Sequence, residues 1–427
     1  MDPIFLKVLL GTMLLASSAA VVGAFSYLKQ QSLVGDAIAH ALLPGVVLAF
    51  ILGEGRHPVY LIFGALVAGL VAHYGISYIQ QRTKLKSDTA VSLVLSTFFG
   101  FGIMLMSYVQ RLGQGQQAGL ERYLLGKAAA ITMLDVYTFS GLAVLLLVGV
   151  GLFYKGFQLM TFNEDFAHAI GLPVGVIRFT FTVLTVLAVT IGIQTVGVVL
   201  MAALLITPSA AARAWTKSLP AMLGIAALIA ALSAAAGTLI SSSIAKMPTG
   251  PWVVLVLGVL GFGSLLFAPE KGLLFKRRRA RAHRAKTLRE NLLKLLYSQE
   301  ERQEKSVQLS LKGMMEIRAM RDEDVRRGLR DLKKRLWIVE RSSTSEAHGP
   351  SYGLTEMGRV EGRRVVRLHR LWELYLTERL GMAADHIHPQ AETMEHVITP
   401  EIESLLIKEL GTPERDPHQS LIPYENE

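Results

Sequence analysis

Apolar runs long enough to cross a lipid bilayer fill the first 268 residues and then stop. Short polar loops divide this region into about nine candidate spans. The spans lie at approximately 4–27, 36–53, 57–80, 88–109, 134–157, 173–195, 196–213, 219–243 and 251–268. Because a helix needs about 20 apolar residues to cross the hydrocarbon core, residues 1–268 predict an all-α polytopic membrane domain with about nine transmembrane helices.

The first apolar run lies where a signal peptide would lie, but it lacks the basic residues that open one. An acidic residue, Asp2, precedes it instead. The run is also long enough to span a membrane. We therefore expect residues 4–27 to form the first transmembrane helix.

Basic residues cluster in three polar segments and predict the orientation of the chain. These segments are residues 81–87, residues 213–217 and the stretch that begins at Lys271. Lys and Arg close to the ends of spans favour the cytoplasmic side. The sequence therefore predicts a multi-pass protein of the inner (plasma) membrane, with its N-terminus outside and its C-terminal region in the cytoplasm.

The composition excludes several kinds of chemistry. Cysteine is absent, which excludes disulfides, thiolate nucleophiles and cysteine-ligated zinc or iron–sulfur centres. The sequence contains no G-x-x-x-x-G-K-[ST] phosphate loop and groups no nucleophile with a base and oxyanion donors. We expect a chain that is not an enzyme and that needs a separate subunit for any ATP hydrolysis.

Two ionisable residues share one face of the second span. In SLVGDAIAHALLPG (32–45), Asp36 and His40 are four residues apart. Ionisable side chains within a membrane are costly unless they face a cavity or a partner, so this pair is a candidate functional site. The alternative is that Asp36 caps the helix and His40 packs between helices.

Several motifs in the apolar region resemble the permease subunits of ABC importers for manganese, zinc and iron. They are SLVGDAIAHALLPG (32–45), KSDTAVSLVLSTFFGFGIMLMS (86–107), LERYLLGK (120–127) and QTVGVVLMAALLITPSAAARAW (194–215). The resemblance implies that Asp36 and His40 contact the ion in transit, and carboxylate with imidazole suits Mn(II), Fe(II) or Zn(II). It also implies a partner ABC ATPase and an external metal-binding solute-binding protein.

The same resemblance implies a short cytoplasmic helix that couples the permease to its ATPase. The segment FNEDFAHAIGLPVG (162–175) matches this role because it is polar and helix-prone, and because Gly171 and Pro173 would end the helix. The alternative is an amphipathic loop between the fifth and sixth spans. The candidate coupling residues are Asn163, Glu164, Asp165, Ala167 and Gly171.

A basic juxtamembrane linker, residues 269–287, follows the last span. Its run KRRRARAHRAK (276–286) is typical of an anchor against anionic lipid at the inner leaflet. Direct contact with nucleic acid is the alternative, and one does not exclude the other.

Residues 288–360 predict a winged helix-turn-helix. Helical patterns at 288–297 and 325–340 come before two β-prone pieces, WIVE and YGLT, that a polar break separates. Basic residues cover the other faces of the second helix. The candidate DNA-binding residues are Arg326, Arg327, Arg330, Lys333 and Lys334.

Potential metal ligands concentrate near the C-terminus. His369 and Glu373 are four residues apart on a predicted helix. Further along, Glu392, Glu395 and His396 share one face of another. Two carboxylates with an imidazole suit a borderline-hard divalent metal. The alternative is two solvated helices that happen to carry these residues.

Residues 288–423 resemble the iron- and manganese-dependent repressor family that includes the diphtheria toxin repressor. The likeness rests on YGLTEMGR, VVRLHRLWELYL and HPQAETMEHVITPEIESLLIKELG. It implies an α-helical metal-binding and dimerisation domain over residues 361–427, a homodimer, and a divalent metal (Mn²⁺ or Fe²⁺, or else Zn²⁺) as co-repressor. One implied site comprises His369, Glu373 and His388; the other comprises Glu392, Glu395 and His396. Glu392 resembles the manganese-sensing members.

The first helix of this region departs from the family pattern. The family takes one or two ligands there, and the corresponding residues are Asn291 and Lys294. Asparagine offers only a neutral carbonyl, and a protonated lysine cannot ligate. The second metal site is therefore expected to be incomplete, or metal no longer controls the DNA-binding helix.

Three functions remain open for the whole chain. In the first, an ATP-driven permease for a divalent transition metal carries a metal-responsive domain that binds operator DNA. In the second, that domain regulates transport in cis and never contacts DNA. In the third, the chain is a secondary metal transporter with a regulatory tail.

Overall fold

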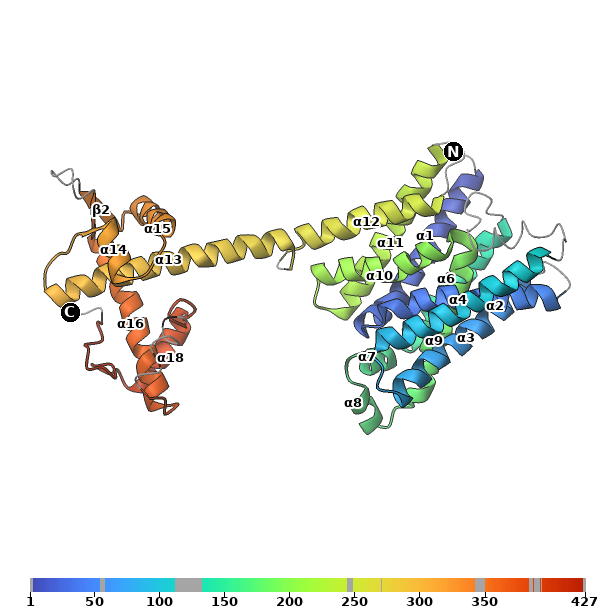
Figure 1. Ribbon diagram of the computed structural model, residues 1–427, viewed down its shortest axis with the longest axis horizontal. Coiled ribbons are helices and arrows are strands. Elements are labelled where there is room, and N and C mark those ends of the chain that lie inside the picture. Colours follow the sequence, from blue (N-terminus) through green and yellow to red (C-terminus); the bar gives the residue numbers. More distant parts are fainter. Residues whose placement is uncertain are drawn as a thin grey trace. The chain divides into compact units, whose positions relative to one another are not determined.

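The computed structural model divides into two compact units, Met1–Lys276 and Arg277–Glu427 (Figure 1). Each unit has its own buried apolar cluster or clusters, so we describe each separately. The residues that the structure describes are 3–53, 58–111, 133–243, 249–269, 271–341, 350–383, 387, 392 and 394–424.

Helices alone make up the described part of the first unit. They are α1 (Pro3–Leu28), α2 (Ser32–Leu52), α3 (Pro58–Arg82), α4 (Ser87–Arg111), α6 (Met133–Leu152), α7 (Tyr154–Phe162), α8 (Glu164–Ala169), α9 (Val174–Val196), α10 (Val198–Trp215), α11 (Leu219–Ser243) and α12 (Thr249–Phe267). Most expected spans therefore correspond to one long helix each.

Within the described residues, seven helices are long and apolar enough to cross a membrane. An eighth is added if α6 and α7, which bend by 66° at Phe153, count as one span. The apolar helix Leu200–Trp215, within α10, is shorter than these. A polytopic all-α membrane domain is thus confirmed, whereas the count of nine spans stays a prediction.

Small residues let the helices of this unit approach closely. α1 packs against α6, α10 and α11, and its inner face is rich in alanine, with Ala19, Ala20 and Ala24 fully buried. At Gly23 a Cβ atom would lie only 1.9 Å from the backbone oxygen of Leu205 on α10. Such contacts replace the hydrophobic effect, which cannot hold helices together in lipid.

The second unit combines helices with a small sheet. Its elements are α13 (Leu273–Gln303), β1 (Leu309–Ser310), α14 (Leu311–Ile317), α15 (Asp322–Lys334), β2 (Ile338–Arg341), β3 (Ser351–Leu354), α16 (Glu356–Glu378) and α18 (Pro400–Leu410). The strand order is β1-β3-β2 and both pairings are antiparallel. The hairpin expected from WIVE and YGLT therefore forms, and β1 is an addition that the sequence analysis did not predict.

Leucines on α13 form the core of this unit. Leu292, Leu293 and Leu296 are fully buried and cluster with residues of α14 and α15, among them Met314 and Val325. The expected helix at 325–340 ends at Lys334, because Leu336 has a φ of +59° and the chain then enters β2. This order places α15 directly before the hairpin.

Candidate functional site

Asp36 and His40 face each other along α2. His40 Nε2 lies 3.7 Å from Asp36 Oδ1, and the side chains are 30% and 37% exposed, His40 first. The residues between them, Ala37 to Ala39, are buried. His40 also meets the edge of the Phe99 ring on α4, with 5.1 Å between ring centroids. The pair thus presents one carboxylate and one imidazole on an otherwise packed helix.

The alternative role of Asp36 as a helix cap is excluded. α2 begins at Ser32, and its N-cap residue is Gln31, which makes no side-chain capping bond. Asp36 is therefore inside the first turns of the helix, past the backbone N–H groups that a cap satisfies. Its carboxylate is available for another role.

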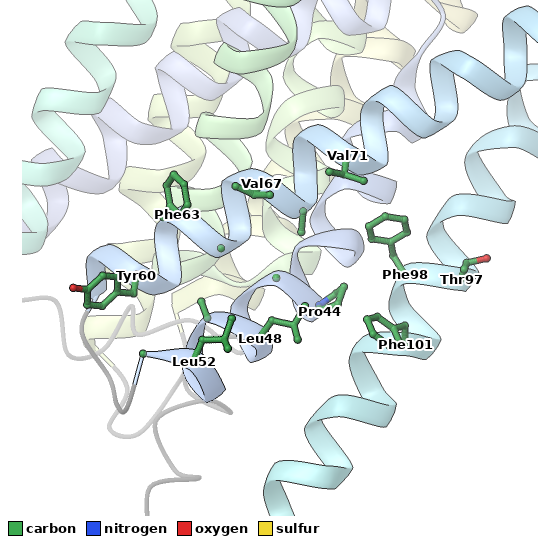
Figure 2. Close-up of a pocket in the computed structure, with 15 residues that line it drawn as sticks. Pro44, Leu48, Leu52, Tyr60, Phe63, Val67, Val71, Thr97, Phe98 and Phe101 are labelled. Atoms are coloured by element: carbon green, nitrogen blue, oxygen red, sulfur yellow. The ribbon is translucent and has the colours of Figure 1, made fainter.

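An apolar pocket lies beside α2, lined by Pro44, Leu48 and Leu52 of that helix (Figure 2). Its volume is about 880 Å³, and α2, α3 and α4 line it. Pro44, Leu48 and Leu52 contribute from α2 in steps of four residues, like Asp36 and His40. Among the described residues that line it, only Tyr60 and Thr97 carry side-chain oxygens, both hydroxyls, so these residues offer no set of metal ligands.

The predicted coupling segment forms a defined short helix, α8. The Asn163 side chain caps it by accepting a hydrogen bond from the backbone N–H of Phe166 at 2.9 Å. Gly171, with a φ of +81°, ends the turn that follows. Arg178 on α9 donates a hydrogen bond to Glu164 within an ion pair. The helix is therefore fixed at its start and tied to α9.

The residues of α8 divide into buried and exposed groups. Ala167 is fully buried, so its contribution is to seat the helix. Phe166 on α8 is 52% exposed, and Phe162 at the end of α7 (60%) and Ile170 directly after α8 (51%) are exposed as well. Sequence reasoning missed these three, although the i, i+4, i+8 pattern of apolar residues in FNEDFAHAI is visible.

Buried carboxylates and histidines from three segments meet in the second unit. α13 supplies Glu290 and Lys294, α16 supplies His369 and Glu373, and the segment before α18 supplies Glu395 and His396. The side chains of the four Glu and His residues from the last two segments are at most 6% exposed. Four of the six sequence-predicted ligands, His369, Glu373, Glu395 and His396, therefore lie close together.

The contacts inside this cluster join acids to bases. Glu395 Oε2 lies 2.8 Å from Lys294 Nζ and 2.5 Å from His369 Nδ1. His369 Nε2 lies 3.1 Å from Glu373. His396 Nδ1 lies 2.7 Å from Glu290 Oε2.

Burial and these partners shift the pKa values in opposite directions. Burial alone would raise the pKa of Glu395, but the His369 hydrogen bond and the charge of Lys294 bring it below its usual value. Burial would lower the pKa of His369, whereas its bonds to Glu373 and Glu395 hold it above 6.5. Burial lowers the pKa of Lys294, and Glu395 offsets only part of that effect.

The cluster does not form a metal centre from the residues described. Within that part of the chain, no three His, Asp or Glu side chains are arranged to hold one ion. Glu392 lies apart from the contacts above, 3.1 Å from Arg318, and His388 lies outside the described residues. The described side chains therefore provide no set of ligands that converges on one ion, although the ligand types are suitable.

Sequence reasoning had flagged Lys294 only as a missing ligand. Glu290 and Lys294 occupy one face of α13 at i, i+4, the same spacing that identified the predicted ligands. That spacing could have indicated that both residues enter the cluster. The partner of each, His396 or Glu395, lies more than 100 positions away, so sequence alone could not pair them.

The predicted DNA-binding residues all lie exposed on α15. Three of them are paired with acids of the same unit: Arg326 with Asp322 at 2.7 Å, Arg327 with Asp324 at 3.8 Å, and Lys333 with Glu340. The first turn of α15 is acidic, comprising Asp322, Glu323 and Asp324. The basic surface of this helix therefore belongs to its middle and C-terminal turns, where Arg330 and Lys334 lie.

Comparison with known proteins covers both units. Residues 1–268 match the family described as the ABC 3 transport family. Residues 355–424 match the domain described as iron dependent repressor, metal binding and dimerisation domain. The two matches therefore cover the membrane unit and the C-terminal helices, in the order expected from sequence.

Individual relatives agree with these matches. The chain is 36% identical over 383 residues to the manganese transport system membrane protein MntC of Bacillus subtilis, covering 88% of this chain and 85% of that one. It is 39% identical to the zinc transport system membrane protein TroC of Treponema pallidum, covering 63% of this chain and 91% of that one. Among solved structures, PsaBC of Streptococcus pneumoniae in complex with Fab aligns at 31% identity, covering 64% of this chain and 94% of that one, with a TM-score of 0.56.

These matches confirm that the chain is a membrane permease subunit and not an enzyme. They agree with the long apolar helices of the first unit. The chain belongs to the ABC 3 transport family and carries, after its membrane unit, a metal-binding and dimerisation domain of the iron-dependent repressor type.

Proposed function

We propose that this chain is the permease of an ATP-driven importer for a divalent transition metal, with Mn²⁺, Zn²⁺ and Fe²⁺ as the candidate substrates. The Asp36–His40 pair carries the proposal, since two half-exposed ionisable groups within a span require a polar path beside them. Two ligand atoms hold a divalent ion weakly, which suits an ion that must leave again. A metal-binding solute-binding protein would deliver the ion from outside.

The orientation of the chain follows from its charge. The basic loops and the run 276–286 favour the cytoplasmic side of the inner membrane. α8 and the C-terminal unit would then both lie in the cytoplasm. Two copies of the chain would pair, as the C-terminal dimerisation domain implies.

The partner ATPase would dock on α8 through its exposed apolar residues. Phe166 on α8, Phe162 at the end of α7 and Ile170 directly after α8 expose apolar surface that water does not favour. Asn163, Glu164 and Gly171 hold this segment in place through the cap, the ion pair with Arg178 and the closing turn. Asp165 lies exposed in the first turn of α8. A short helix with this surface fits a groove on a partner protein.

Replacing Phe166 with Asp is expected to lower ATP-driven metal uptake by at least about tenfold, because a carboxylate cannot be buried in an apolar groove without loss. The measurement is uptake of radioactive Mn²⁺ into proteoliposomes that contain the chain and its ATPase. His168→Asp is the matched control, since it adds the same charge to another exposed position of α8 and should change uptake little.

Liposomes that contain the chain without the ATPase are expected to show no uptake. Uptake driven by an ion gradient alone would contradict the ATP-driven function and support a secondary transporter. Equal uptake by both variants would contradict the docking role of Phe166.

The C-terminal unit is proposed to bind DNA through a winged helix-turn-helix formed by α14, α15 and the β2–β3 hairpin. The exposed residues Arg330 and Lys334 would contact phosphates, with Arg326, Arg327 and Lys333 beside them. The acidic first turn of α15 opposes close contact with bases at that end. We therefore expect mainly electrostatic binding, to DNA upstream of metal-uptake genes.

Reversing both charges, with Arg330→Glu and Lys334→Glu, is expected to lower DNA affinity at least tenfold and to reduce the salt slope by about 2. Gel shifts of the full chain in detergent at several salt concentrations measure both quantities. Lys305→Glu with Lys408→Glu is the control, because it reverses two exposed charges of the same unit away from α15.

Regulation of transport in cis is the second candidate function, and the acidic turn Asp322–Asp324 favours it over base recognition. In this case the full chain binds no DNA even at low salt. Deletion of residues 287–427 discriminates the two, because regulation in cis requires uptake to lose its sensitivity to internal metal.

A further inference from the structure

We propose that the Lys294 ammonium takes the place of a metal ion in the C-terminal unit, so that this unit holds its packed form without one. The proposal concerns only the carboxylate–histidine cluster of α13, α16 and the segment before α18. It rests on the proposed function of the C-terminal unit and adds that metal does not control this unit. Its test does not depend on whether the unit binds DNA.

Lys294 enters the cluster from α13, whereas the predicted ligands come from α16 and the segment before α18. Its side chain is 12% exposed and that of Glu395 is 0% exposed, with 2.8 Å between Nζ and Oε2. A buried ion pair this short forms only where the backbone holds both partners in place. The helix of α13, anchored by its buried leucines, provides that position.

Each carboxylate of the cluster already has a basic partner. Besides the Lys294–Glu395 pair, Glu373 contacts His369 at 3.1 Å and Glu290 has Arg364 at 3.6 Å. Glu392, outside these contacts, lies 3.1 Å from Arg318. Lys286 lies 3.8 Å from Glu290 as well. The negative charge that would attract a divalent ion is therefore matched by the protein itself.

Both ring nitrogens of His369 lie against carboxylate oxygens, those of Glu373 and Glu395. Nitrogen–oxygen distances of 3.1 and 2.5 Å leave no room for a metal ion between the partners, since each metal–ligand bond needs about 2 Å. His396 uses Nδ1 on Glu290, and its Nε2 lies 3.6 Å from Glu395 Oε1. His396 Nε2 and Glu395 Oε1 are thus the only pair left for an ion among these contacts.

Among the described residues, the buried acceptors without a hydrogen-bond donor include Glu395 Oε1 in the cluster and Asn291 Oδ1 on α13. A cation at Glu395 Oε1 would share that carboxylate with Lys294 Nζ and be repelled by it. A water molecule satisfies such acceptors without the repulsion. These atoms therefore do not restore a metal site while Lys294 is present.

The experiment measures Mn²⁺ binding to the full chain in detergent, with Asp36→Ala and His40→Ala as background to remove the pair in the membrane unit. Titration calorimetry is expected to show no Mn²⁺ bound to this protein at micromolar concentrations. Adding Lys294→Glu should lower the Kd for Mn²⁺ at least about tenfold, since a cation is replaced by an oxygen ligand. Arg302→Glu is the control, because it adds a carboxylate to an exposed position of the same helix.

Thermal unfolding gives a second readout. The Tm of the background protein should be the same in EDTA and in Mn²⁺, whereas Lys294→Glu should lower the Tm in EDTA and recover it in Mn²⁺. One Mn²⁺ per chain at a micromolar Kd in the background protein would overturn the proposal. So would a Lys294→Glu protein that binds Mn²⁺ no more tightly than Arg302→Glu.

If Lys294→Glu does not fold, titration of the background protein decides alone. Gel shifts of the same preparation in EDTA separate this proposal from the proposed function. Loss of DNA binding together with absent Mn²⁺ binding would overturn DNA recognition and leave the role of Lys294 supported.

Discussion

Replacing either Asp36 or His40 with Ala is expected to lower metal uptake by at least about tenfold while leaving membrane insertion unchanged. Each substitution removes one of only two adjacent ligand atoms on α2, and an ion passing a single ligand has little reason to leave its hydration shell. Radioactive Mn²⁺ and Zn²⁺ accumulation in cells that express the chain with its ATPase measures the effect.

Conservative variants sharpen the interpretation of this result. Asp36→Glu keeps the carboxylate and should retain part of the uptake, whereas Asp36→Asn keeps the shape and should lose it. Thr97→Val is the control, since Thr97 lines the neighbouring pocket and is exposed. Normal uptake by Asp36→Ala and His40→Ala would assign the pair to helix packing instead.

Gly23→Ala is expected to destabilise the membrane unit by about 3 kcal/mol or to prevent its assembly. The new Cβ atom would lie 1.9 Å from the Leu205 backbone oxygen, so α1 and α10 would have to separate. A flexible side chain could move aside, but a backbone carbonyl in a helix cannot. Thermal unfolding of the full chain in detergent, followed by fluorescence-detected size exclusion, measures the loss.

Gly258→Ala is the matched control for this effect. Gly258 lies inside α12, and a Cβ atom there meets nothing within 4 Å. Alanine favours a helix over glycine by up to about 1 kcal/mol, so the control should be neutral or slightly stabilising. A similar Tm for Gly23→Ala and Gly258→Ala would contradict the close approach of α1 and α10.

The membrane helices could be predicted from sequence because a span needs a fixed length of apolar residues. The same rule could not find the bend at Phe153, since both sides of it are apolar and helical. It also could not predict where α10 begins, because that start depends on Gly197, which has a φ of +86°. Breaks of this kind depend on backbone conformation, which hydropathy does not report.

Residue type and helical spacing predicted the pairs that lie within one helix, but they could not predict contacts between distant segments. Asp36 with His40, and His369 with Glu373, were visible because each pair lies within one helix. The Lys294–Glu395 and Arg318–Glu392 pairs join distant segments. Whether a carboxylate faces a metal or a lysine therefore depends on packing, which no local pattern contains.

The ion pair between Glu164 and Arg178 has a mechanical consequence. Only residues 170–173 separate α8 from α9. The ion pair joins the two helices across this short connection. A movement of α8 would then be passed on to α9, because the ion pair limits how far the connecting loop can flex. If the partner ATPase docks on α8 as proposed, loss of this ion pair would weaken the transmission of movement from α8 to α9 without removing the docking residue Phe166.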